Sequence, residues 1–186
     1  MRDFLKVFIF VVLLLAIPYF VLAGRQSNSS SDFSVSIPFG AKHDYENILV
    51  AKVVDGDTLK LETGERVRLI GIDTPEMHDS EKLYRDSRKS GTNIEDIKAL
   101  GRKAYAFTRN LVENKRVRLE FDVEKYDKYK RLLAYVYLKD DNAFVNAKIV
   151  EEGFASLLTI PPNVKYADLF LELYQGAREN KRGLWK

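Results

Sequence analysis

The 186-residue chain contains no cysteine and only two histidines. Without cysteine, the protein cannot form disulfides, thiolate metal sites or a cysteine nucleophile. The two histidines, His43 and His78, are too few for a histidine-based metal site. The formal net charge of +3 is also too small, taken alone, to indicate a nucleic-acid partner.

The positive charge is nevertheless unevenly distributed along the chain. Residues 98–139 contain twelve lysines and arginines but only five acidic residues. A locally positive face of this kind can attract a polyanion such as a nucleic acid. Ordinary solvated surface charge is the alternative interpretation, and the sequence leaves both open.

An apolar run from Val7 to Ala23 follows the basic start MRDFLK. Residues 1–23 therefore predict either a secretory signal peptide cleaved after Ala23 or a retained N-terminal membrane anchor. Pro18 and the ending V-L-A favour cleavage. In both cases we expect the rest of the chain outside the cell, either secreted or anchored to the outer face of the membrane.

The remainder divides into a linker and one domain. Residues 24–43 are rich in serine and predict a flexible linker, and the domain is placed at residues 44–186. Runs rich in β-branched and aromatic residues predict five strands: Ile48–Val54, Asp57–Glu62, Glu65–Ile72, Arg116–Val123 and Arg131–Leu138. Helical spacing of apolar residues predicts three helices, at about 94–114, 146–152 and 166–180. This order predicts an α+β fold, a five-stranded OB-fold β-barrel with three α-helices.

Several charged residues gather in the second and third predicted strands. If these strands form a hairpin about Gly64, Asp57 lies roughly opposite residues 70–72 and close to Asp73. Arg68 lies in the third strand, and Glu76 follows it closely. Two carboxylates for a hard cation, an arginine for a phosphate and a third carboxylate as base predict a site that cleaves phosphodiesters.

Five sequence blocks in this domain resemble the staphylococcal nuclease (thermonuclease) family: VVDGDTLKL, RLIGIDTPE, GRKAYAFTRNLVENKRVRLEFD, DKYKRLLAYVY and GARENKRGLW. They occur in the family's order and cover nearly all of residues 48–186. The resemblance implies an OB-fold barrel with three helices that cleaves DNA and RNA using Ca²⁺. It also implies cleavage of the bond to the 5′ oxygen, which leaves 3′-phosphate and 5′-hydroxyl ends.

The resemblance also implies a calcium site. Asp57 and Asp73 match the family's calcium ligands, and the Thr74 carbonyl matches a third protein oxygen. Calcium accepts six to eight oxygens, so three from the protein leave room for water and a substrate phosphate. The alternative is that both aspartates end strands or turns and cap backbone amides.

Further residues match positions with roles in catalysis and binding. Arg68 and Arg131 match the two arginines that hold the scissile phosphate, where a guanidinium offers paired donors. The alternative for either arginine is a surface ion pair with an acid such as Glu65 or Asp127. Glu76 matches the carboxylate that is proposed to activate the attacking water.

Lys128 and Tyr129 match substrate-binding positions near a terminal phosphate. Next to them, Lys130 stands where the best-known member of the family has glycine. If this position requires a positive φ, a lysine there costs about 1–2 kcal/mol.

Two longer segments also depart from the family. The segment Met77–Asn93 is longer than in that member. The sequence is compatible with a mobile phosphate-binding flap that uses Lys82, Arg85, Arg88 and Lys89, or with a solvated loop. The segment Leu157–Pro162 lacks the tyrosines that flank the bound nucleotide, which removes base stacking of roughly 1–3 kcal/mol per base.

The sequence therefore predicts a secreted, calcium-dependent nuclease of low sequence specificity. Its expected partners are DNA and RNA, preferably single-stranded or locally opened, with no obligate protein partner and a monomeric state. A membrane-anchored nuclease differs from this only in the fate of residues 1–23. A non-catalytic OB-fold module that binds nucleic acid outside the cell is the alternative from a different functional class.

Overall fold

The structure is a computed structural model that describes residues 43–186. The predicted signal peptide or anchor (residues 1–23) and the predicted linker, apart from His43, lie outside the described residues, so these remain predictions. Within residues 43–186, no helix is long and apolar enough to cross a membrane.

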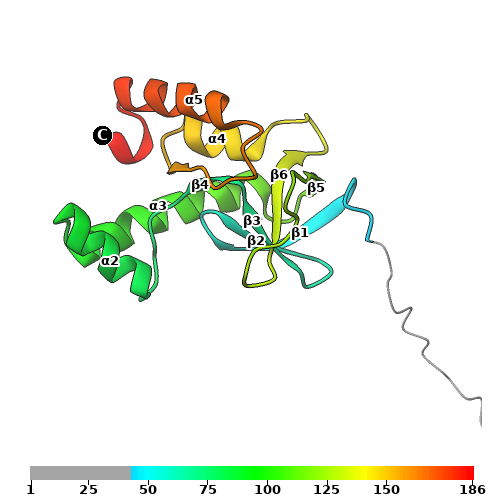
Figure 1. The fold of residues 1–186 in the computed structure, drawn as a ribbon, viewed down its shortest axis with the longest axis horizontal. Helices are drawn as coiled ribbons and strands as arrows, with labels where there is room; N and C mark the ends of the chain where they lie inside the picture. Colours follow the sequence, from blue (N-terminus) through cyan, green and yellow to red (C-terminus); the bar gives the residue numbers. More distant parts are fainter. Residues whose placement is uncertain (1–42) are drawn as a thin grey trace, which may run out of the picture. The chain divides into compact units, whose positions relative to one another are not determined.

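Five strands form a closed barrel in the order β1-β2-β3-β6-β5 (Figure 1). Of the neighbouring pairs, β3 and β6 alone run parallel, and the other pairs are antiparallel. The strands are β1 (Ile48–Asp55), β2 (Thr58–Leu61), β3 (Arg66–Leu69), β5 (Arg116–Glu120) and β6 (Leu132–Leu138). Closure leaves these short strands without an unpaired edge, and it confirms the predicted OB-type barrel.

The alternation of side chains along β3 connects the core to the site. Val67 and Leu69 are almost fully buried, and each such side chain contributes roughly 1.5–3 kcal/mol through burial. Because successive side chains of a strand point to opposite faces, Arg68 lies on the outer face of the barrel. The hydrophobic pattern that fixes the strand thus also fixes the direction of the arginine.

The third predicted strand, Glu65–Ile72, is in fact two strands, so this prediction was wrong. After β3 the chain turns at Gly71, whose φ is +83°, and β4 (Gly71–Asp73) pairs with β7 (Ser156–Leu158). The buried Asn146 stabilises the break, since its side-chain amide donates to the Ile70 carbonyl at 2.9 Å. A two-stranded sheet of β4 and β7 therefore follows directly after β3, and its strand β4 ends at Asp73.

Residues 43–186 contain four α-helices rather than the predicted three. The helices α3 (Ile94–Val112), α4 (Val145–Glu151) and α5 (Ala167–Glu179) confirm the predictions, and a short 3₁₀ helix, η1 (Gly183–Trp185), ends the chain. The fourth helix, α2 (Glu81–Ser90), lies in the segment Met77–Asn93, where the sequence predicted a flap or loop. Its only buried residue is Leu83, so apolar periodicity could not reveal it.

The helices support the barrel from two directions. In Figure 1, α2 and α3 lie at one end of the barrel, and α4 packs with α5 beside β6. The hydroxyl of Thr108 in α3 donates to the Gly56 carbonyl at 2.7 Å, which ties α3 to the turn between β1 and β2.

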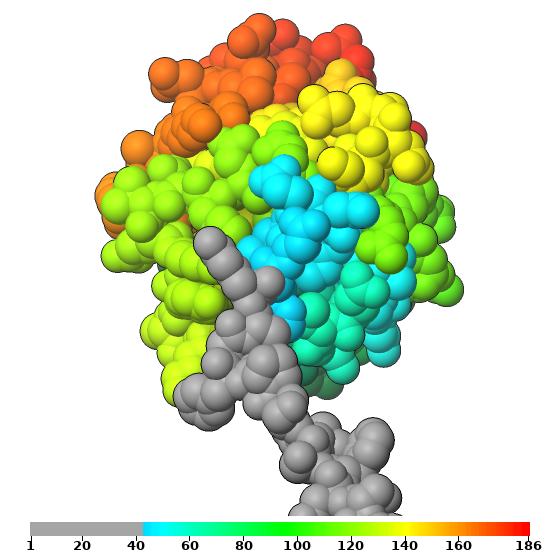
Figure 2. All heavy atoms as spheres, turned by 90° about the vertical axis from the view of Figure 1, so that its right-hand side faces the viewer, coloured from blue at the N-terminus to red at the C-terminus, as the bar shows by residue number. Residues whose placement is uncertain are grey.

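The start of the described chain is fastened to the barrel as well. The Leu119 amide donates to the Tyr45 carbonyl at 2.8 Å, and the rings of Tyr45 and Phe121 pack edge to face at 5.2 Å. Figure 2 shows this first segment in cyan, lying between the loop after β5 and the segment that follows β6.

Candidate active site

Asp57 is the most buried carboxylate of the site, with 7% of its surface exposed. The backbone N–H and the hydroxyl of Thr74 donate to its Oδ2 at 3.0 and 3.2 Å, and the Thr58 hydroxyl donates to its Oδ1 at 3.0 Å. The Leu69 N–H donates to the Asp57 carbonyl, so Asp57 lies opposite Leu69, slightly before the predicted residues 70–72. The hairpin thus brings Asp57 to the start of β4, as the sequence indicated.

Arg68 joins the two aspartates. Its Nη2 lies 3.3 Å from Asp57 Oδ2 and 3.0 Å from Asp73 Oδ1. Its Nη1 donates to the carbonyls of Leu69 and Ile72 at 2.9 and 2.8 Å. Arg68 is therefore held rigidly within the cluster and does not form the alternative surface pair with Glu65.

Lys82, from α2, contacts the other side of the same cluster. Its Nζ lies 3.2 Å from Asp73 Oδ2, 3.1 Å from Glu76 Oε1 and 3.4 Å from Asp86 Oδ2, and it donates to the Thr74 carbonyl at 3.1 Å. The sequence indicated Lys82 only as a cation of a phosphate-binding flap or a solvated loop, and not beside the predicted metal ligands, because its segment was not predicted as a helix. The weak signal that could have found it is the helix start Ser80, which accepts a hydrogen bond from Leu83 N.

The pKa shifts of these groups reflect burial first and the crowding of negative charge second. Burial, followed by repulsion from Asp57, raises the pKa of Asp55 to about 6. Burial also raises the pKa of Asp73, although Lys82 and Arg68 oppose the shift. Burial lowers the pKa of Lys82, but Asp73 and Glu76 outweigh that effect and leave the pKa raised. The cluster consequently favours positive charge beside it.

The predicted calcium ligands form a set that suits a hard cation. Asp57, Asp73 and the Thr74 carbonyl offer only oxygen, which Ca²⁺ prefers. Positively charged groups already converge on these atoms, since Arg68 contacts both aspartates and Lys82 contacts Asp73 and Thr74. Within residues 43–186 no three His, Cys, Asp or Glu side chains form a metal cluster. The two carboxylates and one carbonyl are a smaller set, and their role as metal ligands remains a prediction.

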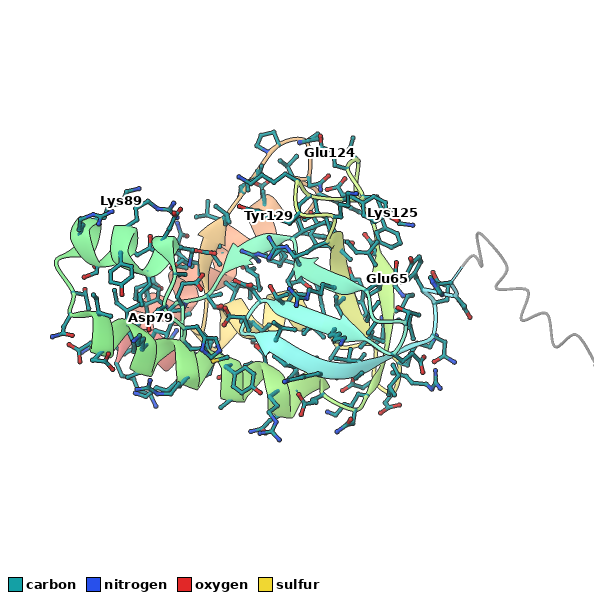
Figure 3. The ribbon with its side chains drawn as sticks, turned by 90° about the horizontal axis from the view of Figure 1, so that it is seen from below. Glu65, Asp79, Lys89, Glu124, Lys125 and Tyr129 are labelled. Atoms are coloured by element: carbon teal, nitrogen blue, oxygen red, sulfur yellow. The ribbon has the colours of Figure 1, made fainter. Side chains whose placement is uncertain are left out.

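Arg131, Lys128 and Tyr129 form a second group, and no ion pair or hydrogen bond joins them to the acidic cluster. Arg131 Nε pairs with Asp127 Oδ2 at 2.7 Å, which is the surface ion pair that the sequence left open. The Tyr129 ring is 68% exposed (Figure 3), with Lys128 Nζ 5.0 Å and Arg131 Cζ 5.4 Å from its centre. Arg131 directly precedes β6, the strand that pairs with β3, which carries Arg68.

The backbone of Lys130 has φ +61°, the left-handed conformation that glycine adopts most readily. The strain expected from the sequence is therefore present, at about 1–2 kcal/mol. Asp127 holds this turn, because its Oδ1 accepts from the N–H groups of Tyr129 and Arg131 at 2.8 and 2.9 Å. The same carboxylate thus fixes both the backbone and the side chain of Arg131.

Two glycines that were not identified from the sequence as site residues allow neighbouring segments to pack closely at the site. A Cβ added to Gly56 would lie 2.7 Å from the Thr74 hydroxyl oxygen. A Cβ on Gly101 would lie 2.7 Å from the carbonyl carbon and oxygen of Glu76. Gly101 lies inside α3, and an isolated glycine within a helix is the signal that could have drawn attention to it.

The fold and the site together define an OB-type barrel that carries an acidic, oxygen-rich cluster with a partly buried arginine on its outer face. The family described as Staphylococcal nuclease homologue matches residues 66–186. Thermonuclease of Staphylococcus intermedius is 37% identical over 178 residues, which cover 94% of this chain and 95% of that protein. Endonuclease YncB of Bacillus subtilis is 33% identical over 144 residues, or 75% of this chain and 61% of that protein. The chain belongs to the staphylococcal nuclease family.

A third relative is also similar over most of its length. Uncharacterized protein MJ1439 of Methanocaldococcus jannaschii is 39% identical over 153 residues, which cover 77% of this chain and 73% of that protein. The resemblance inferred from the five sequence blocks is therefore confirmed at the level of the family.

Proposed function

We propose that this protein is a calcium-dependent nuclease that hydrolyses phosphodiester bonds of DNA and RNA with little sequence specificity. It acts outside the cell, either secreted or held at the outer face of the membrane, and works as a monomer. Membership of a nuclease family and the thermonuclease and endonuclease names of its relatives support a nuclease. The calcium dependence, the reaction products and the location rest on the sequence.

The observation that carries the proposal is the convergence of four groups at the end of β4. Asp57, Asp73 and the Thr74 carbonyl face positively charged groups, and Glu76 is linked to them through Lys82. An arrangement of carboxylates that attracts cations beside a fixed arginine suits the binding of a metal and a phosphate together. A purely structural strand end would not need all of these groups.

In this proposal Asp57, Asp73 and the Thr74 carbonyl would hold Ca²⁺, which would act as a Lewis acid toward a phosphoryl oxygen. Arg68 and Arg131 donate to the phosphate and stabilise the charge that develops at phosphorus. For Arg131 this requires exchange of Asp127 for the phosphate. Lys128 and Tyr129 hold the neighbouring part of the strand.

Glu76 accepts a proton from the attacking water, whose oxygen then bonds to phosphorus. The bond from phosphorus to the 5′ oxygen breaks, and that oxygen leaves as a hydroxyl after taking a proton from solvent. The phosphate stays on the 3′ side. Single-stranded or locally opened substrates are favoured, because an unpaired strand can bend its backbone to fit the site and a stiff duplex cannot.

The competing function is an OB-fold module that binds nucleic acid without cleaving it. The exposed Tyr129 ring with its two neighbouring cations would serve such a module equally well. The acidic cluster would not, because three carboxylates on the binding face repel a polyanion in the absence of a metal. The cluster therefore favours the enzyme.

The test is cleavage of single-stranded DNA by the full-length chain in calcium and then in EGTA. We expect cleavage in calcium only, with 3′-phosphate ends, and a loss of roughly 10²-fold or more in Glu76→Gln. Glu172→Gln in α5 carries the same chemical change at an exposed position and should leave the rate unchanged. Binding of DNA without cleavage in any condition would support the non-catalytic module instead.

A further inference from the structure

The ammonium group of Lys82 lies where the proposed metal ligands converge. Its Nζ is within 3.1–3.2 Å of Asp73 Oδ2, Glu76 Oε1 and the Thr74 carbonyl. Two of these three, Asp73 and Thr74, are proposed ligands of the metal. Only 25% of the Lys82 side chain is exposed, so water screens these electrostatic contacts only weakly.

A metal ion and this ammonium cannot occupy the cluster together without a large penalty. Two cations that share Asp73 and Thr74 would lie within a few ångströms of each other. Even at the effective dielectric constant of a protein surface, like charges about 4 Å apart repel strongly. Binding of a divalent ion therefore requires Lys82 to move away.

The helix that carries Lys82 offers a second position for the displaced group. Asp86 lies one turn further along α2, and its Oδ2 is already 3.4 Å from Lys82 Nζ. A residue four positions away on a helix is a natural ion-pair partner. The ammonium can therefore withdraw along the helix surface and keep a carboxylate partner.

The attachment of α2 also permits such a change. Leu83 is the only buried residue of the helix, whose ends are fixed by the Ser80 cap and by Gly91 in the left-handed conformation. A helix held by one buried side chain has few packing contacts that resist a small shift. Movement of Lys82 thus leaves the core of the barrel undisturbed.

We propose that Lys82 is a built-in counter-cation that holds Asp73, Glu76 and the Thr74 carbonyl in place before metal binding, and that the metal displaces it toward Asp86. Lys82 is a positioning residue and sets the affinity for calcium. This inference rests on the proposed function, because it takes the same oxygens as the metal site.

The first experiment compares calcium binding by calorimetry in the full-length wild-type chain, Lys82→Met and Lys98→Met. We expect Lys82→Met to bind calcium about tenfold more tightly or better, because the competing positive charge is gone. Lys98→Met removes the same charge from a neighbouring helix, where Lys98 pairs with Asp79 and Glu95, and should change the affinity less than about twofold.

The second experiment uses the wild-type chain, so it does not depend on the folding of a variant. Lysines are acetylated with a limiting amount of acetic anhydride, and modification at each site is measured by mass spectrometry. Calcium should raise acetylation of Lys82 several-fold, because its ammonium leaves the three oxygens. Lys98 should react at the same rate with and without calcium.

The outcomes separate this inference from the proposed function. Equal calcium affinity in wild type and Lys82→Met, or unchanged acetylation of Lys82 at saturating calcium, overturns the counter-cation while leaving a calcium-dependent nuclease intact. Absence of calcium binding in all three proteins overturns the calcium requirement itself, and the inference with it. Tighter binding in Lys82→Met together with calcium-dependent acetylation supports both.

Discussion

At the scale of single residues, the site consists of carboxylates that are bridged by two positively charged side chains. Arg68 contacts both aspartates, and Lys82 contacts Asp73 and Glu76. Removal of one partner would leave a partly buried charge without compensation, which usually costs more than the pair contributes. These side chains therefore depend on one another.

Lys130→Gly is expected to stabilise the protein by about 0.5–1 kcal/mol. Glycine adopts φ +61° without steric cost, and the relief exceeds the added freedom of the unfolded chain. Urea unfolding measures the change. Lys128→Gly is the control: this residue does not have a positive φ, so the same replacement should lower the stability or leave it unchanged. A lower stability of Lys130→Gly would show that the strain is absent.

The sequence predicted that the charged residues of the hairpin lie close together, but it did not predict α2. Asp57, Asp73 and Arg68 come together because a tight hairpin relates positions that lie close in the chain. Lys82 belongs to the site through a helix with one buried apolar residue, and no periodic pattern marks it. Arg131 was predicted to hold phosphate, and in the structure its side chain pairs with Asp127.

At the scale of elements, α3 supports the backbone on both sides of the candidate site. Its Thr108 is bonded to the Gly56 carbonyl, and its Gly101 lies against the backbone of Pro75 and Glu76. The helix therefore contacts both ends of the site. A small displacement of α3 would be transmitted to Glu76, because the backbone in contact cannot rotate away as a side chain can.

Gly101→Ala is expected to lower the cleavage rate at least tenfold. The added methyl would lie 2.7 Å from the Glu76 backbone and must push it aside, and misplacement of a catalytic group by a fraction of an ångström is costly. Stability should fall by about 1–3 kcal/mol from overpacking, less up to about 1 kcal/mol gained in helix propensity.

Gly176→Ala in α5 provides the matched control for this replacement. A Cβ at Gly176 meets no atom within 4 Å, so only the gain in helix propensity remains. We expect a stability increase of about 0.5–1 kcal/mol and an unchanged cleavage rate. Equal behaviour of the two variants in urea unfolding and in the cleavage assay would contradict the role of Gly101.

At the scale of the whole molecule, the basic stretch 98–139 is partly neutralised by the fold. Several of its arginines and lysines form ion pairs, namely Lys98, Arg109, Arg116, Arg118 and Arg131. Lys98 and Arg116 pair with acids outside the stretch, Glu95 and Glu62, so the local excess of positive charge is smaller than the sequence count. Solvated surface charge accounts for these five residues, and the other seven cations of the stretch lie outside these pairs.

Binding of a short single-stranded DNA in EDTA should therefore depend on salt less steeply than twelve unpaired cations would give. With about two to four phosphates neutralised, the slope of log K against log salt concentration is expected between about −1.4 and −2.8. Fluorescence anisotropy at several salt concentrations measures it. The Lys128→Ala variant should reduce the magnitude of the slope by about 0.7, whereas a slope beyond about −5 would require a larger basic face.

The barrel as a whole was predictable, but the two-stranded sheet of β4 and β7 was not. Five runs of apolar residues gave the strands and the class of fold. The division of the third run into β3 and β4, and the pairing of β4 with β7, depend on Asn146 and on Gly71, which cannot be placed without the tertiary contacts. Pairing over such distances in the chain leaves no local pattern.

The parallel pairing of β3 with β6 joins residues that are far apart in the chain, and it places the start of β6 beside the strand of Arg68. Arg68, the first of the two arginines proposed to hold the phosphate, is thus synthesised early, and Arg131, the second, is synthesised much later. An unfinished or unfolded chain holds no assembled site, however much of its sequence is present. A cell that makes this protein would be protected from it until the barrel closes, and for a chain that folds only after export, this delay would itself be a safeguard.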